Sequence, residues 1–169
     1  MMAMDQFKDY EIFVTGHSLG GALSQLLSFG LAGSPLTEDL PKPITAITFA
    51  SPLVGNHEWL KAYQKLEKEG KLRHIRVSNN GDHVCCQPAI PFMGYTQTGV
   101  NIHLFANKKA DVGYRHTRSS YSAFEFSGPL SMHSLTTYLD RLLGNEENLD
   151  FMDNTVEEFY EEFAGDCSA

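Results

Sequence analysis

The stretch EIFVTGHSLGGALS, residues 11–24, places Ser18 between two glycines at a point where one sequence pattern gives way to another. The apolar and β-branched residues 11–15 are typical of a short buried strand. From Leu19 onward, small residues and leucines are typical of a helix. A strand that passes directly into a helix must reverse sharply. The pattern therefore predicts that Ser18 lies on a strained turn, with its hydroxyl exposed at the carboxyl edge of a sheet.

The two glycines of this turn are Gly16 and Gly20, and we expect that a side chain at either position would collide across it. Two roles are open to the serine between them. Ser18 could simply cap the helix, with the glycines easing the turn. It could instead act as a nucleophile, because the N–H of Leu19 and the positive end of the helix dipole would then face a developing oxyanion.

Strand and helix patterns alternate along the first half of the chain. Apolar residues at helical spacing between Leu19 and Leu31 predict one apolar face of the first helix, and Gly33 and Pro35 predict its end. The elements that follow are a strand at 44–50, a helix at 57–70 with inward-facing Leu60, Tyr63 and Leu66, and a strand at 72–78. Helices of this length between strands imply parallel pairing, so the fold class is α/β, a mostly parallel sheet flanked by helices.

The second half of the chain is less regular. Residues 99–106, GVNIHLFA, alternate and predict a further strand with one polar face. Residues 106–130 show no clean period and predict a loop. Residues 131–144, SMHSLTTYLDRLLG, carry leucines at helical spacing and predict a helix that closes on Gly144.

The final segment, residues 145–169, is strongly acidic. It contains nine of the 21 acidic residues and no Lys or Arg, so residues 1–144 carry 13 basic and 12 acidic residues and are nearly neutral. Thr155 followed by Glu158 fits a capping box for a short amphipathic helix. Its apolar stripe consists of Met152, Val156, Phe159 and Phe163. We expect this helix to pack on its own domain, with docking on a partner as the alternative.

Composition and spacing exclude several classes of protein. A nearly neutral body argues against a nucleic-acid surface, which needs clustered cations. No spacing of the seven histidines or three cysteines suggests a metal site, and no cofactor is predicted. No apolar run is long enough to cross a bilayer, and the N-terminus lacks a signal-peptide pattern. As written, the chain is expected to be cytoplasmic with reduced thiols, unless a preceding segment carries a targeting signal.

A serine nucleophile needs a histidine to accept its proton and a carboxylate to orient that histidine. In a strand–turn–helix architecture the three follow in the order Ser, Asp or Glu, His. Asp82 lies in a glycine-containing turn directly after the strand at 72–78, where we expect the acid. An Asp in such a turn can also serve the turn alone. Asp111, in the irregular loop, and Asp140, on a helix flank, are the alternatives.

The base is predicted to be His133, which lies at the start of the last predicted helix of residues 1–144, where a loop delivers side chains to the sheet edge. His116 also follows Asp82 and is the alternative, whereas His103 falls within a strand. The histidines excluded because they precede or adjoin the acid, or are expected to point elsewhere, are His17, His57, His74 and His83.

Four blocks of the sequence resemble the fungal-type triacylglycerol lipases, or class 3 lipases. In order they are VTGHSLGGALSQLLS, ITFASPLVGN, VSNNGDHVCCQP and MHSLTTYL. The resemblance spans residues 13–143 and implies an α/β-hydrolase fold and hydrolysis of ester bonds in acylglycerols or related lipids. It carries Ser18 onto the nucleophile, Asp82 onto the acid, His133 onto the base, and Leu19 onto the backbone oxyanion donor.

The chain departs from that family in two places. The proline that usually follows the acid closely is delayed to Pro88, and about ten residues precede the first strand where family members carry earlier strands, a second oxyanion donor and a lid helix. The resemblance therefore implies a partial, N-terminally truncated α/β-hydrolase domain at residues 1–144, followed by the tail at 145–169. We expect a serine ester hydrolase with a lipid substrate and transient contact with lipid surfaces. The alternative is a catalytically impaired fragment that binds lipid or protein.

Overall fold

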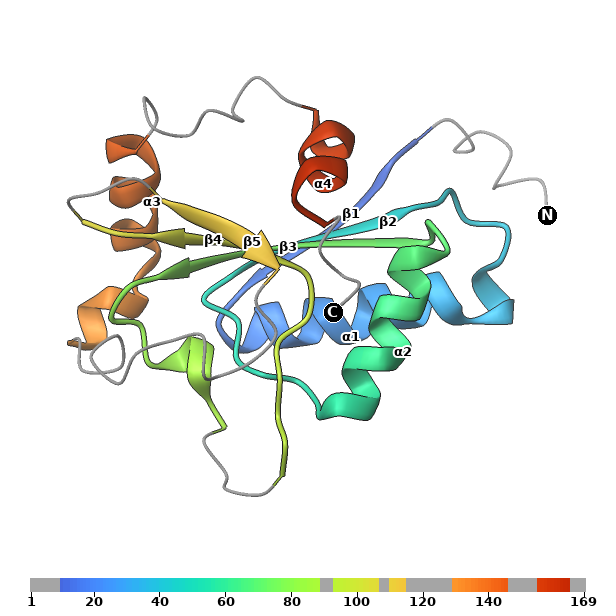
Figure 1. The fold of residues 1–169 in the computed structure, drawn as a ribbon, viewed down its shortest axis with the longest axis horizontal. Helices are drawn as coiled ribbons and strands as arrows, with labels where there is room; N and C mark the ends of the chain where they lie inside the picture. Colours follow the sequence, from blue (N-terminus) through green and yellow to red (C-terminus); the bar gives the residue numbers. More distant parts are fainter. Residues whose placement is uncertain (1–9, 89–92, 107–109, 115–128, 146–154, 165–169) are drawn as a thin grey trace.

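The computed structural model describes residues 10–88, 93–106, 110–114, 129–145 and 155–164. These residues form a five-stranded sheet in the order β1-β2-β3-β4-β5, with helices on both faces (Figure 1). The strands are β1 (Ile12–His17), β2 (Ile44–Phe49), β3 (Leu72–Asn79), β4 (Val100–Leu104) and β5 (Asp111–Tyr114). The helices are α1 (Leu19–Gly33), α2 (His57–Lys68), α3 (Leu135–Gly144) and α4 (Val156–Ala164), with short 3-10 turns η2 (Pro35–Thr37), η3 (Val84–Cys86) and η6 (Leu130–His133).

The first four strands pair in parallel, and β5 pairs antiparallel to β4. The predicted α/β class with a mostly parallel sheet is therefore confirmed. Because the strands are parallel, the loops that leave β1, β2 and β3 meet at one edge. One detail of the prediction is wrong: β1 is an edge strand of the described sheet, and its Phe13 is 50% exposed rather than buried.

The two faces of the sheet carry separate apolar clusters. Helices α1 and α2 cover one face, and α3 and α4 cover the other (Figure 1). The first cluster joins Ala32, Ile44, Tyr63, Leu66 and Leu72. The second joins residues of β3 and β4 to Tyr138 of α3 and to Phe159 and Tyr160 of α4, and includes the buried cysteines Cys85 and Cys86. None of the described helices is long and apolar enough to cross a bilayer.

Helix α4 begins at the predicted capping box. The Thr155 N–H donates to the Glu158 carboxylate at 2.7 Å, and the Glu158 N–H donates to Thr155 Oγ1 at 3.2 Å. Phe159 and Tyr160 are buried, and Arg73 of β3 forms an ion pair with Glu157 at 2.7 Å. The helix therefore packs on its own sheet, as expected. Met152 and the side chain of Phe163, the ends of the predicted stripe, lie outside what the structure describes.

The region around β4 and β5 corrects two expectations. Strand β5 lies inside the predicted loop at 106–130, where no periodicity marks it because a strand of four residues is too short to show one. The polar side chains of β4 are buried rather than solvated, since Asn101 and His103 are 0% and 2% exposed. They are tolerated because Ser78 of β3 hydrogen-bonds to both, at 3.0 and 2.7 Å.

The buried face of α1 is not its leucine face. The residues that it buries are Gly21, Ser24, Gln25, Ser28 and Ala32. Its leucines at 19, 23, 26 and 27 are 49–69% exposed. Small residues face the sheet because the helix lies very close to it: a Cβ added at Gly21 would fall 2.8 Å from the Cβ of Ser51. The predicted helix is present, but its apolar stripe faces outward.

Candidate active site

Ser18 lies between the last residue of β1 and the first residue of α1, with φ 59° and ψ −128°. An L-residue rarely adopts this conformation, which costs on the order of 1–3 kcal/mol and persists only where the surroundings enforce it. Here the Ser18 N–H donates to the Phe49 carbonyl of β2 at 3.0 Å, and the Ser18 carbonyl accepts from Gly21 and Ala22. The Ser18 side chain makes no capping hydrogen bond to α1, so the helix-cap alternative is wrong.

The two glycines of the turn play different parts. A Cβ at Gly16 would lie 2.3 Å from the Gly20 carbonyl oxygen, a distance that no side chain can occupy. A Cβ at Gly20 would meet no atom within 4 Å. The expected collision is therefore real at Gly16 and wrong at Gly20, because it is the carbonyl of Gly20, and not its Cα substituent, that faces back across the turn.

Three side chains from separate parts of the sequence meet at this turn. His133 Nε2 lies 2.8 Å from Ser18 Oγ. On the other side of the imidazole, His133 Nδ1 lies 3.0 and 3.1 Å from the two carboxylate oxygens of Asp82. A carboxylate only accepts, so Nδ1 carries the proton, and in neutral imidazole Nε2 is then the bare nitrogen that can accept from the serine hydroxyl.

Asp82 follows β3 in the turn predicted for it, and its side chain is completely buried. Its Oδ1 accepts from the Val84 N–H at 2.9 Å, so the carboxylate also holds its own turn. Its Oδ2 accepts from the Tyr138 hydroxyl at 2.8 Å. Each oxygen therefore has at least one fixed donor besides His133, which compensates the cost of burying a charge.

His133 ends the short turn η6 just before α3, and 22% of its side chain is exposed. Its backbone is held by a residue that the sequence prediction placed elsewhere. The Nε2–H of His17 donates to the His133 carbonyl at 2.8 Å, and the two rings lie 4.7 Å apart. His17 therefore faces the site, and the expectation that it points away is wrong. The sequence feature that could have indicated this role is the position of His17 next to Ser18, at the end of β1.

The alternative acids and the rejected His103 belong to other elements of the fold. Asp140 is exposed on α3, and Asp111 belongs to β5. His103 is buried in β4 against Ser78. The alternative base His116 lies outside the described residues.

The N-terminus of α1 completes the geometry. Leu19 is its first residue, and the first N–H groups of a helix have no partner within the helix. The dipole of the 15-residue helix also concentrates partial positive charge at this end. The N–H of Leu19 directly follows Ser18 in the chain, at the end of the helix that attracts negative charge.

The chain is similar to known proteins in sequence and in fold. A family profile described as Lipase (class 3) matches residues 2–92, more than half of the 169 residues. The chain belongs to this family. The matched segment of the class 3 lipase chain contains Ser18 and Asp82, and His133 lies beyond it.

Several relatives of this class 3 lipase chain are similar over part of their length. Phospholipase A1-II 4 of Oryza sativa subsp. japonica is 39% identical over 101 residues, which is 59% of this chain and 24% of that protein. Lipase ZK262.3 of Caenorhabditis elegans is 36% identical over 83 residues, 49% of this chain and 22% of that protein. A lipase from Rhizopus microsporus var. chinensis shares the fold, with a TM-score of 0.58 at 24% identity over 78% of this chain and 46% of that one. The chain thus spans about a quarter of the length of these two sequence relatives.

A buried polar network supports helix α1 of this class 3 lipase chain. Gln25 of α1 donates to Ser51 Oγ at 2.7 Å and accepts from Thr98 Oγ1 at 3.1 Å. Thr98 and Thr48 hydrogen-bond to the two ring nitrogens of His74. Burial, and to a smaller extent the nearby Arg76 guanidinium, lower the pKa of His74 well below its ordinary value. The imidazole is therefore neutral and serves the packing of α1.

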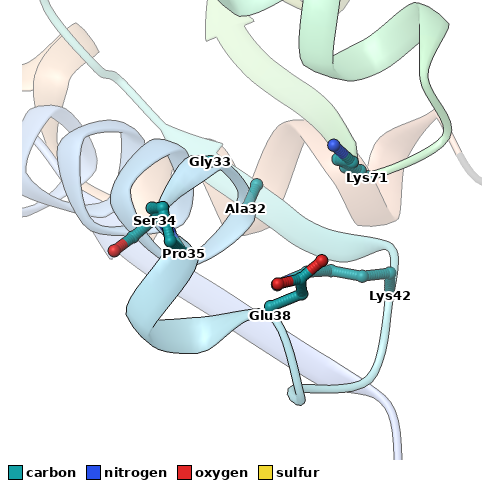
Figure 2. A pocket seen from close by; sticks show the side chains of 7 residues that line it. All are labelled: Ala32, Gly33, Ser34, Pro35, Glu38, Lys42 and Lys71. Carbon is teal, nitrogen blue, oxygen red and sulfur yellow. The ribbon is translucent and has the colours of Figure 1, made fainter.

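Two surface cavities bordered by described residues lie at the end of the strands opposite to Ser18. One of about 220 Å³ is bordered by Glu38, Lys42 and Lys71 where α1 ends and the chain turns toward β2 (Figure 2). Lys42 donates to the carbonyls of Leu31 and Thr37, so it caps the end of α1. Another of about 400 Å³ lies beside the start of β1. Among the described residues, no group of three or more His, Cys, Asp or Glu is arranged to hold a metal ion.

Proposed function

We propose that this chain is a serine carboxylic ester hydrolase that acts on lipid esters, with Ser18 as nucleophile, His133 as general base and Asp82 as the acid that orients it. The observation that carries the proposal is the continuous hydrogen-bonded series from Ser18 Oγ through His133 to Asp82, with separations of 2.8 and 3.0 Å. The strained backbone of Ser18 supports it, because such strain concentrates at functional sites.

In the first half of the reaction His133 Nε2 removes the proton of Ser18 Oγ as that oxygen attacks the ester carbonyl carbon. The resulting tetrahedral intermediate carries its negative charge on the former carbonyl oxygen. Collapse of the intermediate breaks the bond to the alcohol, which takes the proton from His133 and leaves. The acyl group remains on Ser18. In the second half, water replaces the alcohol and the same proton transfers release the fatty acid.

The surroundings of the triad favour these steps. When His133 carries two protons, its positive charge faces the buried Asp82 carboxylate, which stabilises the imidazolium. The Leu19 N–H is proposed as an oxyanion donor. One such donor contributes about 10²–10³-fold to turnover, because it stabilises the negative charge on the oxygen of the tetrahedral intermediate.

The proposed substrate is a triacylglycerol-like ester, as the family resemblance suggests. The second candidate is a phospholipid, because the 39% identical relative is named a phospholipase A1. Two leucines close in the chain to the proposed catalytic residues are exposed: Leu19, next to Ser18, is 69% exposed, and Leu130, at the start of η6, is 84% exposed. Their apolar surface suits acyl chains and transient contact with a lipid surface.

The decisive experiment is hydrolysis of short-chain p-nitrophenyl esters by the purified chain and by Ser18→Ala. We expect the variant to lose activity by at least about 10⁴-fold, because no other group can form the acyl-enzyme. The matched control is Ser34→Ala at the other end of α1, whose hydroxyl caps η2. Equal activity in the wild type and Ser18→Ala would refute the proposal.

A fluorophosphonate probe tests the alternative of an impaired lipid-binding module. An activated Ser18 becomes labelled, and the His133→Ala variant loses labelling because the hydroxyl is no longer activated. A chain that binds lipid vesicles but resists the probe would support the module instead.

The substrate is then resolved with two lipids presented in the same detergent: tributyrin and a short-chain phosphatidylcholine. Release of fatty acid from tributyrin alone supports the triacylglycerol assignment. Release from the phosphatidylcholine alone supports the phospholipid assignment.

A further inference from the structure

Tyr138 of α3 connects the helix to the acid of the proposed triad. The residue is 1% exposed, and its hydroxyl lies 2.8 Å from Asp82 Oδ2 and 3.0 Å from the backbone nitrogen of Asn79. No other described phenol hydrogen-bonds to a residue of the triad. The hydroxyl thus bridges the end of β3, the turn that carries Asp82, and α3.

The direction of these hydrogen bonds is settled by their partners. The Asn79 N–H can only donate, so it donates to the Tyr138 oxygen. The Asp82 carboxylate can only accept, so the Tyr138 O–H donates to it. Burial, with further contributions from Cys85 and Asp82, raises the pKa of Tyr138 well above its ordinary value. The phenol therefore keeps its proton and remains a donor.

The Tyr138 donor limits how Asp82 can interact with His133. Oδ2 is shared between the Tyr138 hydroxyl and His133 Nδ1, and Oδ1 accepts from the Val84 N–H. The carboxylate plane is thus defined by donors on two sides. A donated hydrogen bond also withdraws electron density from Oδ2, which weakens its attraction for the imidazolium.

We propose that Tyr138 is a positioning residue for the reaction proposed above: it holds the Asp82 carboxylate in the plane of the His133 ring and lowers its basicity toward that ring. The proposal rests on the proposed function for its kinetic consequences. Its effect on the titration of His133 is independent of any substrate.

The other groups that face this pair are few among the described residues. His17 of β1 packs against the His133 ring, with centroids 4.7 Å apart. Cys85 lies 3.7 Å from Asp82 Oδ2 and 3.5 Å from the Tyr138 hydroxyl, and burial raises the pKa of its thiol, which stays neutral. Arg76 of β3 acts electrostatically on Cys85. The Cys85 thiol donates to the same oxygen, Asp82 Oδ2, but a thiol is a weak donor and the Tyr138 hydroxyl is the stronger one.

The test compares Tyr138→Phe with Tyr63→Phe. Tyr63 of α2 is also fully buried and its hydroxyl contacts Ser28, on the opposite face of the sheet, so its variant removes the same atom without touching the triad. We expect Tyr138→Phe to lower kcat about 10-fold or more with KM within about twofold, since one charge-assisted hydrogen bond is lost. Tyr63→Phe should leave both constants within about twofold.

The pH dependence supplies a readout that a purely structural role would not move. Without the Tyr138 donor, Asp82 attracts the His133 proton more strongly, so the imidazole should titrate at higher pH. We expect the acid limb of kcat/KM to move upward in Tyr138→Phe, together with the ¹⁵N NMR titration of the His133 ring. Coincident titrations in the wild type and Tyr138→Phe would overturn the proposal.

A second substitution keeps the proposal testable if Tyr138→Phe folds poorly. Placing 3-fluorotyrosine at position 138 preserves the hydroxyl and strengthens it as a donor, so the His133 titration should move to lower pH instead. A shift in the same direction as in Tyr138→Phe would overturn the proposal. If no variant or wild type hydrolyses esters while these opposite shifts are observed, the proposed function fails and the positioning role stands.

Discussion

Helices α1 and α2 cover the same face of the sheet, yet they bury opposite kinds of residue. Helix α2 buries Leu60, Tyr63 and Leu66 and presents its charges to solvent, as its sequence pattern predicts. Helix α1 buries glycine, serine, glutamine and alanine and presents four leucines to solvent. The difference shows that an apolar stripe identifies a helix without identifying which side of it meets the sheet.

The contrast has a geometric cause. Helix α2 is joined to its neighbouring strands by loops, so it can lie far enough from the sheet for large side chains to fit between them. Helix α1 begins one residue after β1 ends, and Ser18 alone makes the turn. Its first turns therefore lie against β1 and the loop after β2, where Gly21 approaches Ser51 too closely for a larger residue.

The largest expected effect tests the turn that forces this approach. Gly16→Ala should destabilise the fold by more than about 4 kcal/mol or prevent folding, because its Cβ would lie 2.3 Å from a backbone carbonyl that cannot move away. Gly20→Ala is the control from the same motif and should stay folded. Chemical denaturation monitored by circular dichroism measures both, and equal stability of the two variants would refute the geometric explanation.

A smaller effect is expected where the two helices are compared leucine by leucine. Leu66→Ala in α2 should lower the free energy of unfolding by about 2–5 kcal/mol, because Leu66 is 8% exposed and its loss leaves a cavity. Leu26→Ala in α1 should change it by less than about 0.5 kcal/mol, since Leu26 is 49% exposed. Urea titrations of the two variants measure their free energies of unfolding. A larger loss of stability for Leu26→Ala than for Leu66→Ala would mean that the leucine face of α1 is covered.

The polar layer under α1 predicts a dependence of stability on pH. The pKa of His74 is lowered in the folded state, so below pH 6.5 the unfolded chain takes up a proton that the folded chain does not. This contribution to stability is fully present above pH 6.5 and is lost as pH falls, with a slope of up to about 1.4 kcal/mol per pH unit. Urea unfolding at several pH values measures the slope, and His74→Gln should reduce it. An unchanged slope in that variant would assign the dependence to other groups.

The smallest expected effect lies at the far end of α1. A Cβ at Gly30 would meet no atom within 4 Å, so Gly30→Ala should raise the free energy of unfolding by about 0.5–1 kcal/mol by restricting the unfolded chain. Thermal melts compare it with the wild type. A loss of stability would mean that the exposed side of α1 has less free space than its leucines indicate.

Much of the candidate site could be predicted from local sequence. The strand–Gly-x-Ser-x-Gly–helix pattern placed Ser18 on a strained turn, and chain order with the turn after β3 pointed to Asp82 and then to His133. The structure brings these three side chains within hydrogen-bonding distance. The capping box at Thr155 could likewise be predicted from the sequence, because its two hydrogen bonds join residues that are three positions apart.

The sequence by itself therefore determined the order of the elements from β1 to β4, the turn at Ser18 and the identity of the three triad residues that meet there. Each depends on neighbours along the chain or on the parallel arrangement of strands, whereas β5 was missed. Only the tertiary structure decided which face of α1 is buried, that Gly20 tolerates a Cβ, and that His17 and Tyr138 hold His133 and Asp82. These features depend on distances between segments far apart in the chain: 116 residues separate His17 from His133, and 56 separate Asp82 from Tyr138. No periodicity records such distances, because they are set by how closely the helices pack on the sheet.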